Sequence, residues 1–83
     1  MDIMNRARVW EMWERGLEVH RKYGTKPHVF MEFSGHVDWF EIRVFKDGWR
    51  EDNTTPDFER RFDTHNEITL DGFCQVTDYL DSL

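Results

Sequence analysis

The sequence predicts an α+β fold in which two helices cover an antiparallel sheet of three to four strands. Apolar residues recur at helical spacing near both ends of the chain, and two segments between them alternate with a period of two. The resulting order of helix, strand, strand, strand, helix is typical of helices packed on an antiparallel sheet. The 83 residues suffice for one small core, so we expect a single domain over residues 1–83.

The first helix is expected over residues 5–23, with Asp2 or Asn5 as its N-cap and Gly24 at its end. Its charged residues gather in one stripe, which includes two i,i+4 pairs of opposite charge: Glu11 with Arg15, and Glu18 with Lys22. Apolar residues spread over more than half of the circumference, which is wider than one sheet face covers. Either the second helix covers the remainder, or part of it is an exposed interface.

Residues 28–34 and 39–46 are rich in aromatic and β-branched residues and alternate in polarity, so they predict two strands joined by the loop 35–38. One face of the second strand, expected to face the helix, carries Phe40, Ile42 and Val44. The other face carries Trp39, Glu41, Arg43 and Phe45.

The dipeptide Asp47-Gly48 is a strong hairpin signal, because glycine supplies the positive φ that a type I′ turn requires. We therefore expect a third strand to begin at Trp49. The next segment is polar and ends in a proline, so the sequence does not show how this strand continues. Residues 58–65 alternate weakly in polarity, which is compatible with a return to the sheet after a loop. The path of residues 50–66 is not determined by the sequence.

A final helix is expected over residues 70–82, with Thr69 as its N-cap. Its apolar residues recur at helical spacing, and its outer face carries acids and no base: Asp71, Asp78 and Asp81. Two of these acids lie near the negative end of the helix dipole, where an unpaired carboxylate is unfavourable. This local conflict hints at a functional surface.

The cysteine content and the hydropathy restrict the cellular compartments that we expect for this protein. The only cysteine, Cys74, excludes an internal disulfide and is typical of a reducing compartment. No apolar run is long enough to cross a bilayer, and the first 20 residues lack the core of a signal peptide. We therefore expect a cytoplasmic protein that is complete from Met1, has no membrane partner and has no cofactor.

Residues for catalysis or metal binding are present without a recognisable pattern. His36 with Asp38 and Asp63 with His65 offer two imidazoles and two carboxylates, but their spacing matches no metal-site template. The chain also lacks a phosphate-binding loop, a nucleophile elbow and a cysteine–histidine signature. We expect a protein that is not an enzyme, and a small metal-dependent enzyme is the weaker alternative.

Charge is distributed unevenly along the chain. The net charge is −6, and residues 51–83 carry nine acidic and two basic residues. The two bases, Arg60 and Arg61, are flanked by Glu59 and Asp63, so direct binding of nucleic acid is not expected. Carboxylates on a rigid scaffold can instead occupy the phosphate sites of a basic protein groove.

The acids between the second hairpin and the last helix are the candidate partner-binding residues: Glu51, Asp52, Asp57, Glu59, Asp63 and Glu67. In this interpretation the protein binds a nucleic-acid-binding protein through its basic groove. The same charges would equally serve solubility, because a net charge of this size is ordinary for a small domain.

A homodimeric interaction module is the first alternative, because the apolar arc of the first helix is wide. The residues expected at such an interface are Met12, Val19 and Tyr23. A dimer of this kind would be insensitive to salt, whereas binding through the acids would depend on it.

In layout, the chain resembles the small acidic anti-CRISPR proteins of phages and prophages that inhibit the type II RNA-guided nuclease. The points of resemblance are the order of elements, Ser34-Gly35 at the first hairpin loop, Ile42-Arg43-Val44 in the second strand and Asp47-Gly48. In that family, acidic loop residues resemble DNA to the nuclease and block the site that reads the motif flanking the target. The resemblance implies an inhibitor or accessory factor of a mobile element that acts in the host cytoplasm, and it assigns no role to an individual residue.

Overall fold

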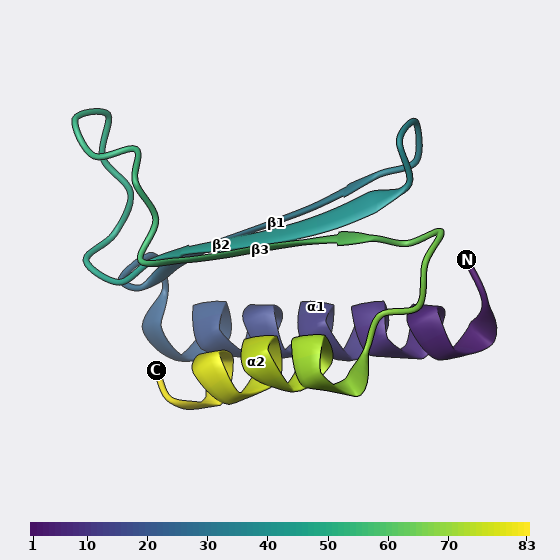
Figure 1. Ribbon diagram of the computed structural model, residues 1–83. Helices are drawn as coiled ribbons and strands as arrows, with labels where there is room; N and C mark the ends of the chain where they lie inside the picture. Colours follow the sequence, from purple (N-terminus) through teal and green to yellow (C-terminus); the bar gives the residue numbers. More distant parts are fainter.

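The computed structural model describes all 83 residues and has two layers, a three-stranded sheet and a pair of helices that cover one of its faces (Figure 1). The elements are α1 (Ile3–Tyr23), β1 (His28–Ser34), β2 (Trp39–Phe45), β3 (Phe58–Asp63) and α2 (Leu70–Asp81). The sheet is antiparallel with the order β1-β2-β3, so β1 and β3 are its edges. The predicted α+β class is confirmed, and the five elements share one core.

Helix α1 begins two residues earlier than expected, because Asp2 is its N-cap. The Asp2 carboxylate accepts a hydrogen bond from the backbone N–H of Asn5 at 2.8 Å. Gly24 ends the helix with a positive φ of 74°, which glycine adopts without strain. The middle of α1 lies close to β1, because a Cβ at Gly16 would collide with the side chain of Met31.

Strand β2 runs through the centre of the sheet and confirms the expected division of its faces. Phe40, Ile42 and Val44 are fully buried toward the helices and pair with β1 and β3 on either side. They form the core together with Met12 of α1 and Val76 of α2. Because β2 lies between two neighbouring strands, Glu41 and Phe45 on its other face are buried as well.

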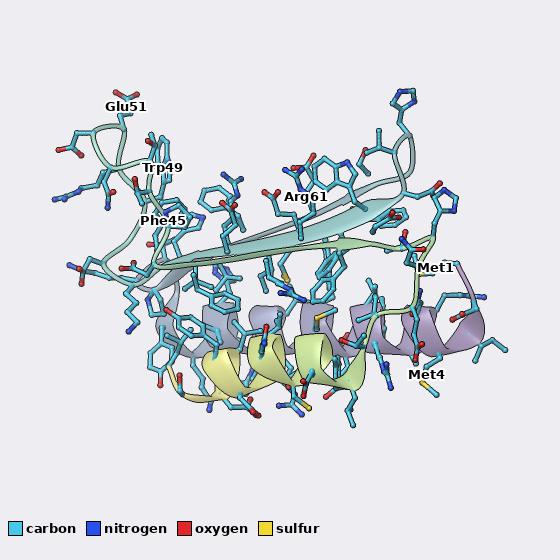
Figure 2. The ribbon with its side chains drawn as sticks, in the orientation of Figure 1. Met1, Met4, Phe45, Trp49, Glu51 and Arg61 are labelled. Carbon is cyan, nitrogen blue, oxygen red and sulfur yellow. The ribbon has the colours of Figure 1, made fainter.

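The expectation that a third strand begins at Trp49 is wrong. Gly48 does adopt the positive φ of a turn, at 87°, and its N–H donates to the carbonyl of Phe45. The chain then leaves the sheet in a loop that rises away from the helices, and the loop carries Trp49 and Glu51 (Figure 2). Residues 50–55 offer no alternating apolar side chains to pair with β2, so the sheet resumes only at β3.

Helix α2 packs beneath β3, as its sequence pattern predicts. Thr69 is the N-cap and accepts a hydrogen bond from the backbone N–H of Gly72 at 3.1 Å. Near the other end of the helix, the ring of Tyr79 stacks on Phe58 of β3 with a centroid distance of 4.3 Å. These contacts place α2 on the β3 side of the molecule, while α1 lies under β1.

Asn5 ties the start of α1 to the connection between β3 and α2. Its side-chain N–H group donates to the carbonyls of Thr64 and Asn66, and its oxygen accepts from the backbone N–H of Ile68 at 2.9 Å. Asn5 is almost fully buried, so these hydrogen bonds satisfy groups that water does not reach. The Asn5 side chain therefore holds the start of α1 against the segment that leads into α2.

Candidate protein-binding surfaces

The sheet face turned away from the helices carries arginines, carboxylates and aromatic rings that engage one another. The buried carboxylate of Glu41 accepts hydrogen bonds from Arg61 at 2.8 and 3.0 Å and lies 3.1 Å from Arg43. The same arginines cover aromatic rings: Arg61 lies 4.3 Å from the centroid of Trp39 and Arg43 lies 5.0 Å from that of Phe30. Both positive charges of this face are thus engaged within the chain, although Arg61 projects outward (Figure 2).

The six candidate acids lie on the edge strand β3 and on the segments just before and after it, which together we call the acidic side. All six side chains are exposed. Two lie in the loop before β3, one lies at the base of that loop, two lie on β3 itself and one lies in the connection to α2: Glu51 and Asp52, Asp57, Glu59 and Asp63, and Glu67. Because β3 is an edge strand, no further strand covers these carboxylates.

Few of these charges are neutralised by the chain itself. Only Asp52 forms an ion pair, with the exposed Arg50 at 3.5 Å. The two bases of the same segment are engaged by other groups, because Arg61 pairs with Glu41 and Arg60 lies over a phenylalanine ring of β3. Arg61 nevertheless shares its sheet face with Glu59 and Asp63, since alternate residues of a strand point the same way. The acidic excess of the sequence is therefore also an excess of unpaired charge in space.

Two of the six acids also shape the backbone around them. Asp57 accepts a hydrogen bond from the backbone N–H of Lys46 at 2.7 Å, which holds the base of the loop against the end of β2. Asp63 accepts from the backbone N–H of His65 at 3.0 Å, which forms the turn after β3. The other four carboxylates accept no hydrogen bond of this kind, so they can be changed without removing a contact of the fold.

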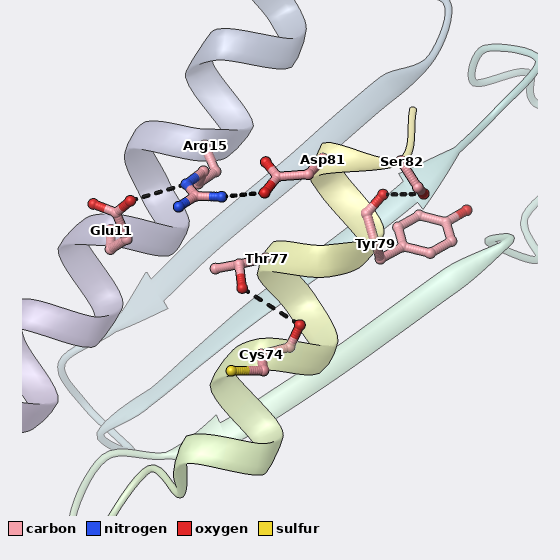
Figure 3. Close-up of polar contacts among 7 residues, drawn as sticks. All are labelled: Glu11, Arg15, Cys74, Thr77, Tyr79, Asp81 and Ser82. Carbon is pink, nitrogen blue, oxygen red and sulfur yellow. Dashed lines mark hydrogen bonds and ion pairs between the residues drawn. The ribbon is translucent and has the colours of Figure 1, made fainter.

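The outer face of α2 is less purely acidic than its sequence suggests. Asp71 and Asp78 are exposed and unpaired, but Asp81 forms an ion pair with Arg15 of α1 (Figure 3). Arg15 also donates to Glu11 at 2.9 Å, and hydrogen bonds to Asp81 and Glu11 raise the pKa of its guanidinium. The predicted base-free face is thus corrected at Asp81, where the base comes from the other helix.

The residues expected at a dimer interface are placed elsewhere by the structure. Met12 and Val19 are 0% and 5% exposed and lie in the core, so their side chains are not available to a second copy. Tyr23 is half-exposed, and its hydroxyl donates to the backbone carbonyl of Leu83 at 3.2 Å. The prediction is wrong for Met12 and Val19, because α2 and the sheet together cover this part of the arc of α1.

A different part of the arc is exposed. Ile3, Trp10 and Leu17 are 81%, 64% and 45% exposed, and they form a stripe along α1 on the flank away from α2. Beside Trp10 lies an open groove of about 320 Å³ that Phe33 of β1 also lines. We call the stripe and Phe33 the apolar flank. In the sequence, the three residues of the stripe are spaced seven residues apart. This spacing is hard to recognise because many other apolar residues of the helix surround them.

Of the histidine and carboxylate residues considered for metal binding, His65 and Asp38 form the one close contact. His65 Nε2 lies 2.7 Å from Asp38 Oδ2, between the start of β2 and the connection to α2. Asp63 is engaged in its turn, and His36 is exposed in the loop 35–38. No group of three or more histidine, cysteine or acidic side chains converges in a way that could hold a metal ion.

Comparison of the chain with protein-family models, with curated proteins and with solved structures finds no match. Neither helix combines the length and apolar character needed to cross a membrane. The acidic side along β3 and the apolar flank on α1 and β1 are therefore the features from which a function can be argued.

Proposed function

We propose that this protein acts without catalysis, by binding the basic groove of a nucleic-acid-binding protein through its acidic side. The observation that carries the proposal is the lack of ion pairing: five of the six acids form no ion pair, and the two arginines of the segment are engaged by Glu41 and by a phenylalanine ring. Exposed carboxylates fixed on a strand and its flanking loops can make charge-assisted hydrogen bonds to arginine and lysine where phosphates would bind.

The same arrangement favours rapid association. A surface dominated by one sign of charge attracts an oppositely charged groove over about a Debye length, which is roughly 10 Å at 0.1 M salt. In its most specific form, the proposal is an inhibitor or accessory factor of a phage or other mobile element. That form rests on the resemblance in layout to anti-CRISPR proteins, which would make the RNA-guided nuclease the groove that is bound.

The test is capture of partners from a bacterial lysate on the immobilised protein, with identification of each retained protein by mass spectrometry. Glu59→Gln with Glu67→Gln removes two charges from the acidic side without removing a hydrogen bond of the fold. Glu32→Gln with Asp47→Asn removes two charges elsewhere and is the matched control. We expect a nucleic-acid-binding protein to be retained by the wild type and the control but released by the first variant.

Two outcomes would contradict the proposal at different levels. If both double variants retain the same proteins as the wild type, the acidic side does not recognise a partner and its charges serve solubility. A purified type II nuclease loaded with guide RNA tests the narrower form, because its binding to target DNA would then be inhibited by the wild type. If only that assay fails, a nucleic-acid-binding partner is still proposed, but the RNA-guided nuclease is rejected as that partner.

A further inference from the structure

The exposed residues of the apolar flank and its neighbours on α1 are spaced symmetrically about Trp10. Ile3 and Leu17 lie seven residues before and after Trp10, and Arg6 and Glu14 lie four residues before and after it. Residues three, four and seven apart share one side of a helix, so all five face the same direction. A base and an acid thus occupy equivalent positions on either side of one exposed tryptophan.

Neither charge of this pattern is satisfied within the chain. Arg6 and Glu14 are exposed and form no ion pair or side-chain hydrogen bond, although other charged residues of α1, such as Arg15 and Arg21, do. They cannot pair with each other, because eight residues of helix separate them by about 12 Å. A partner that covers Trp10 therefore has to offer an acid at one end and a base at the other.

We propose that the partner is a second copy of this chain, with the two α1 helices antiparallel and Trp10 at the twofold axis. In a twofold interface, each residue meets a counterpart that meets it in return. Reversal of the helix about Trp10 brings Arg6 of one copy level with Glu14 of the other, at both ends. The same reversal brings Ile3 level with Leu17, so charge faces opposite charge and apolar side chain faces apolar side chain.

The surface beside Trp10 has room for a second tryptophan. The groove on the sheet side of Trp10 is lined by Val9, Trp13 and Phe33, and five of its six lining residues are hydrophobic. A second groove, on the other side of Trp10, is lined by Ile3 and Ala7. An indole from the other copy can therefore bury its ring where apolar surface is already exposed, which stabilises association without loss of an internal contact.

The dimer uses the exposed face of α1, which packs against β1, whereas the acidic side follows the other edge strand, β3. It goes beyond the proposed function and does not depend on it, because Glu51, Glu59 and Glu67 take no part. A dimer would present two acidic sides, one from each copy. Since its centre is apolar, it should persist at salt concentrations that screen binding through the acidic side.

The decisive experiment is a charge exchange followed by sedimentation velocity between about 1 and 500 µM protein. We expect the wild type to dimerise with concentration, and Glu14→Arg or Arg6→Glu alone to raise the dissociation constant about tenfold, since like charges then face each other. Arg6→Glu combined with Glu14→Arg restores opposite charges at both ends, so dimerisation returns to within about threefold of the wild type. Within one chain the two positions are too distant for this rescue.

A substitution at the centre provides a second measurement. Trp10→Ser should abolish the dimer while circular dichroism stays native, because the indole is 64% exposed and supports little of the core. The proposal is overturned if the wild type stays monomeric at about 500 µM. It is equally overturned if the charge exchange fails to restore association, because then the contact does not join Arg6 to Glu14.

Discussion

The two long sides of this domain differ in the way they can recognise a partner. The side formed by β3 and α2 presents carboxylates that the chain leaves unpaired, whereas the side formed by β1 and α1 presents Ile3, Trp10 and Leu17. Charge attracts at a distance and is screened by salt, while apolar surface acts on contact and is insensitive to salt. The two proposed interfaces should therefore respond differently to salt.

The largest expected effect concerns Asn5, which joins the two sides. Asn5→Ala leaves the carbonyl groups of Thr64 and Asn66 and the N–H of Ile68 without their buried partner. Because an unsatisfied buried polar group costs about 1–3 kcal/mol, we expect the free energy of unfolding to fall by about 3 kcal/mol. Urea denaturation measures this loss. Asp2→Ala, which removes only the helix cap, should cost about 1 kcal/mol and is the control.

A loss below about 1 kcal/mol for Asn5→Ala would mean that water replaces the asparagine. In that case the connection between β3 and α2 would be held by other contacts, such as the hydrogen bond from Arg8 to the carbonyl of Ile68. The two sides would then be independent in stability as well as in recognition.

Salt provides the sharpest separation of the two interfaces. Between about 50 and 500 mM NaCl, we expect binding of a basic partner to the acidic side to weaken at least about tenfold, because the Debye length shortens from roughly 14 to 4 Å. The dissociation constant of the α1 homodimer should change less than about threefold over the same range. Fluorescence anisotropy of the partner and sedimentation of the protein measure the two constants. Equal salt dependence would show that both interfaces are electrostatic.

The elements could be predicted from the sequence where local pattern and tertiary environment agree. The periodicity of apolar residues predicts the helices and the first two strands. Capping chemistry predicts that α1 ends at Gly24 and that α2 starts after Thr69. The start of the third strand could not be predicted, because Asp47-Gly48 specifies a turn but not the path of the chain beyond that turn. The sequence instead predicts a strand at Trp49, and the pairing partner of β2 arrives only at Phe58.

The candidate interface on α1 shows a second limit. The width of the apolar arc indicates that two surfaces cover α1, but it does not indicate which residues each surface covers. Met12 and Val19 become part of the core only because α2 packs beside them. Trp10 stays exposed because α2 packs on the other flank of α1. Asn5 is similar, since its partners are about 60 residues away in the chain. Docking of distant elements is decided by the whole core and leaves no local signal.

A smaller effect is expected at the ion pair that joins the helices beneath the sheet. Arg15 and Asp81 are both substantially exposed, so their coupling energy should be about 0.5 kcal/mol, which is typical of exposed pairs. A double-mutant cycle with Arg15→Ala and Asp81→Ala isolates this energy. The pair of Glu18 and Arg21 within α1 is the matched control, since it joins no elements. A coupling that does not fall at about 500 mM NaCl would indicate that the pair is shielded from solvent.

The smallest effect at neutral pH, and the one with the clearest pH dependence, is expected at Tyr79 under the acidic side. Its hydroxyl is buried without a hydrogen-bond partner, so Tyr79→Phe should change the free energy of unfolding at pH 7 by less than about 0.5 kcal/mol. Burial, and next the charge of Asp57, raises the pKa of this phenol above its ordinary value of 10.0. The folded state therefore holds the proton more tightly than the unfolded state does.

The raised pKa sets the sign of the pH dependence. The stability contributed by the protonated phenol is fully present below pH 10 and is lost as the pH rises through the raised pKa. The wild type should thus lose stability above pH 10 relative to Tyr79→Phe, which has no phenol to ionise at this position. Urea denaturation of both proteins at several pH values between about 8 and 11 measures the difference. Parallel curves would mean that the phenol has the same pKa in the folded and the unfolded protein.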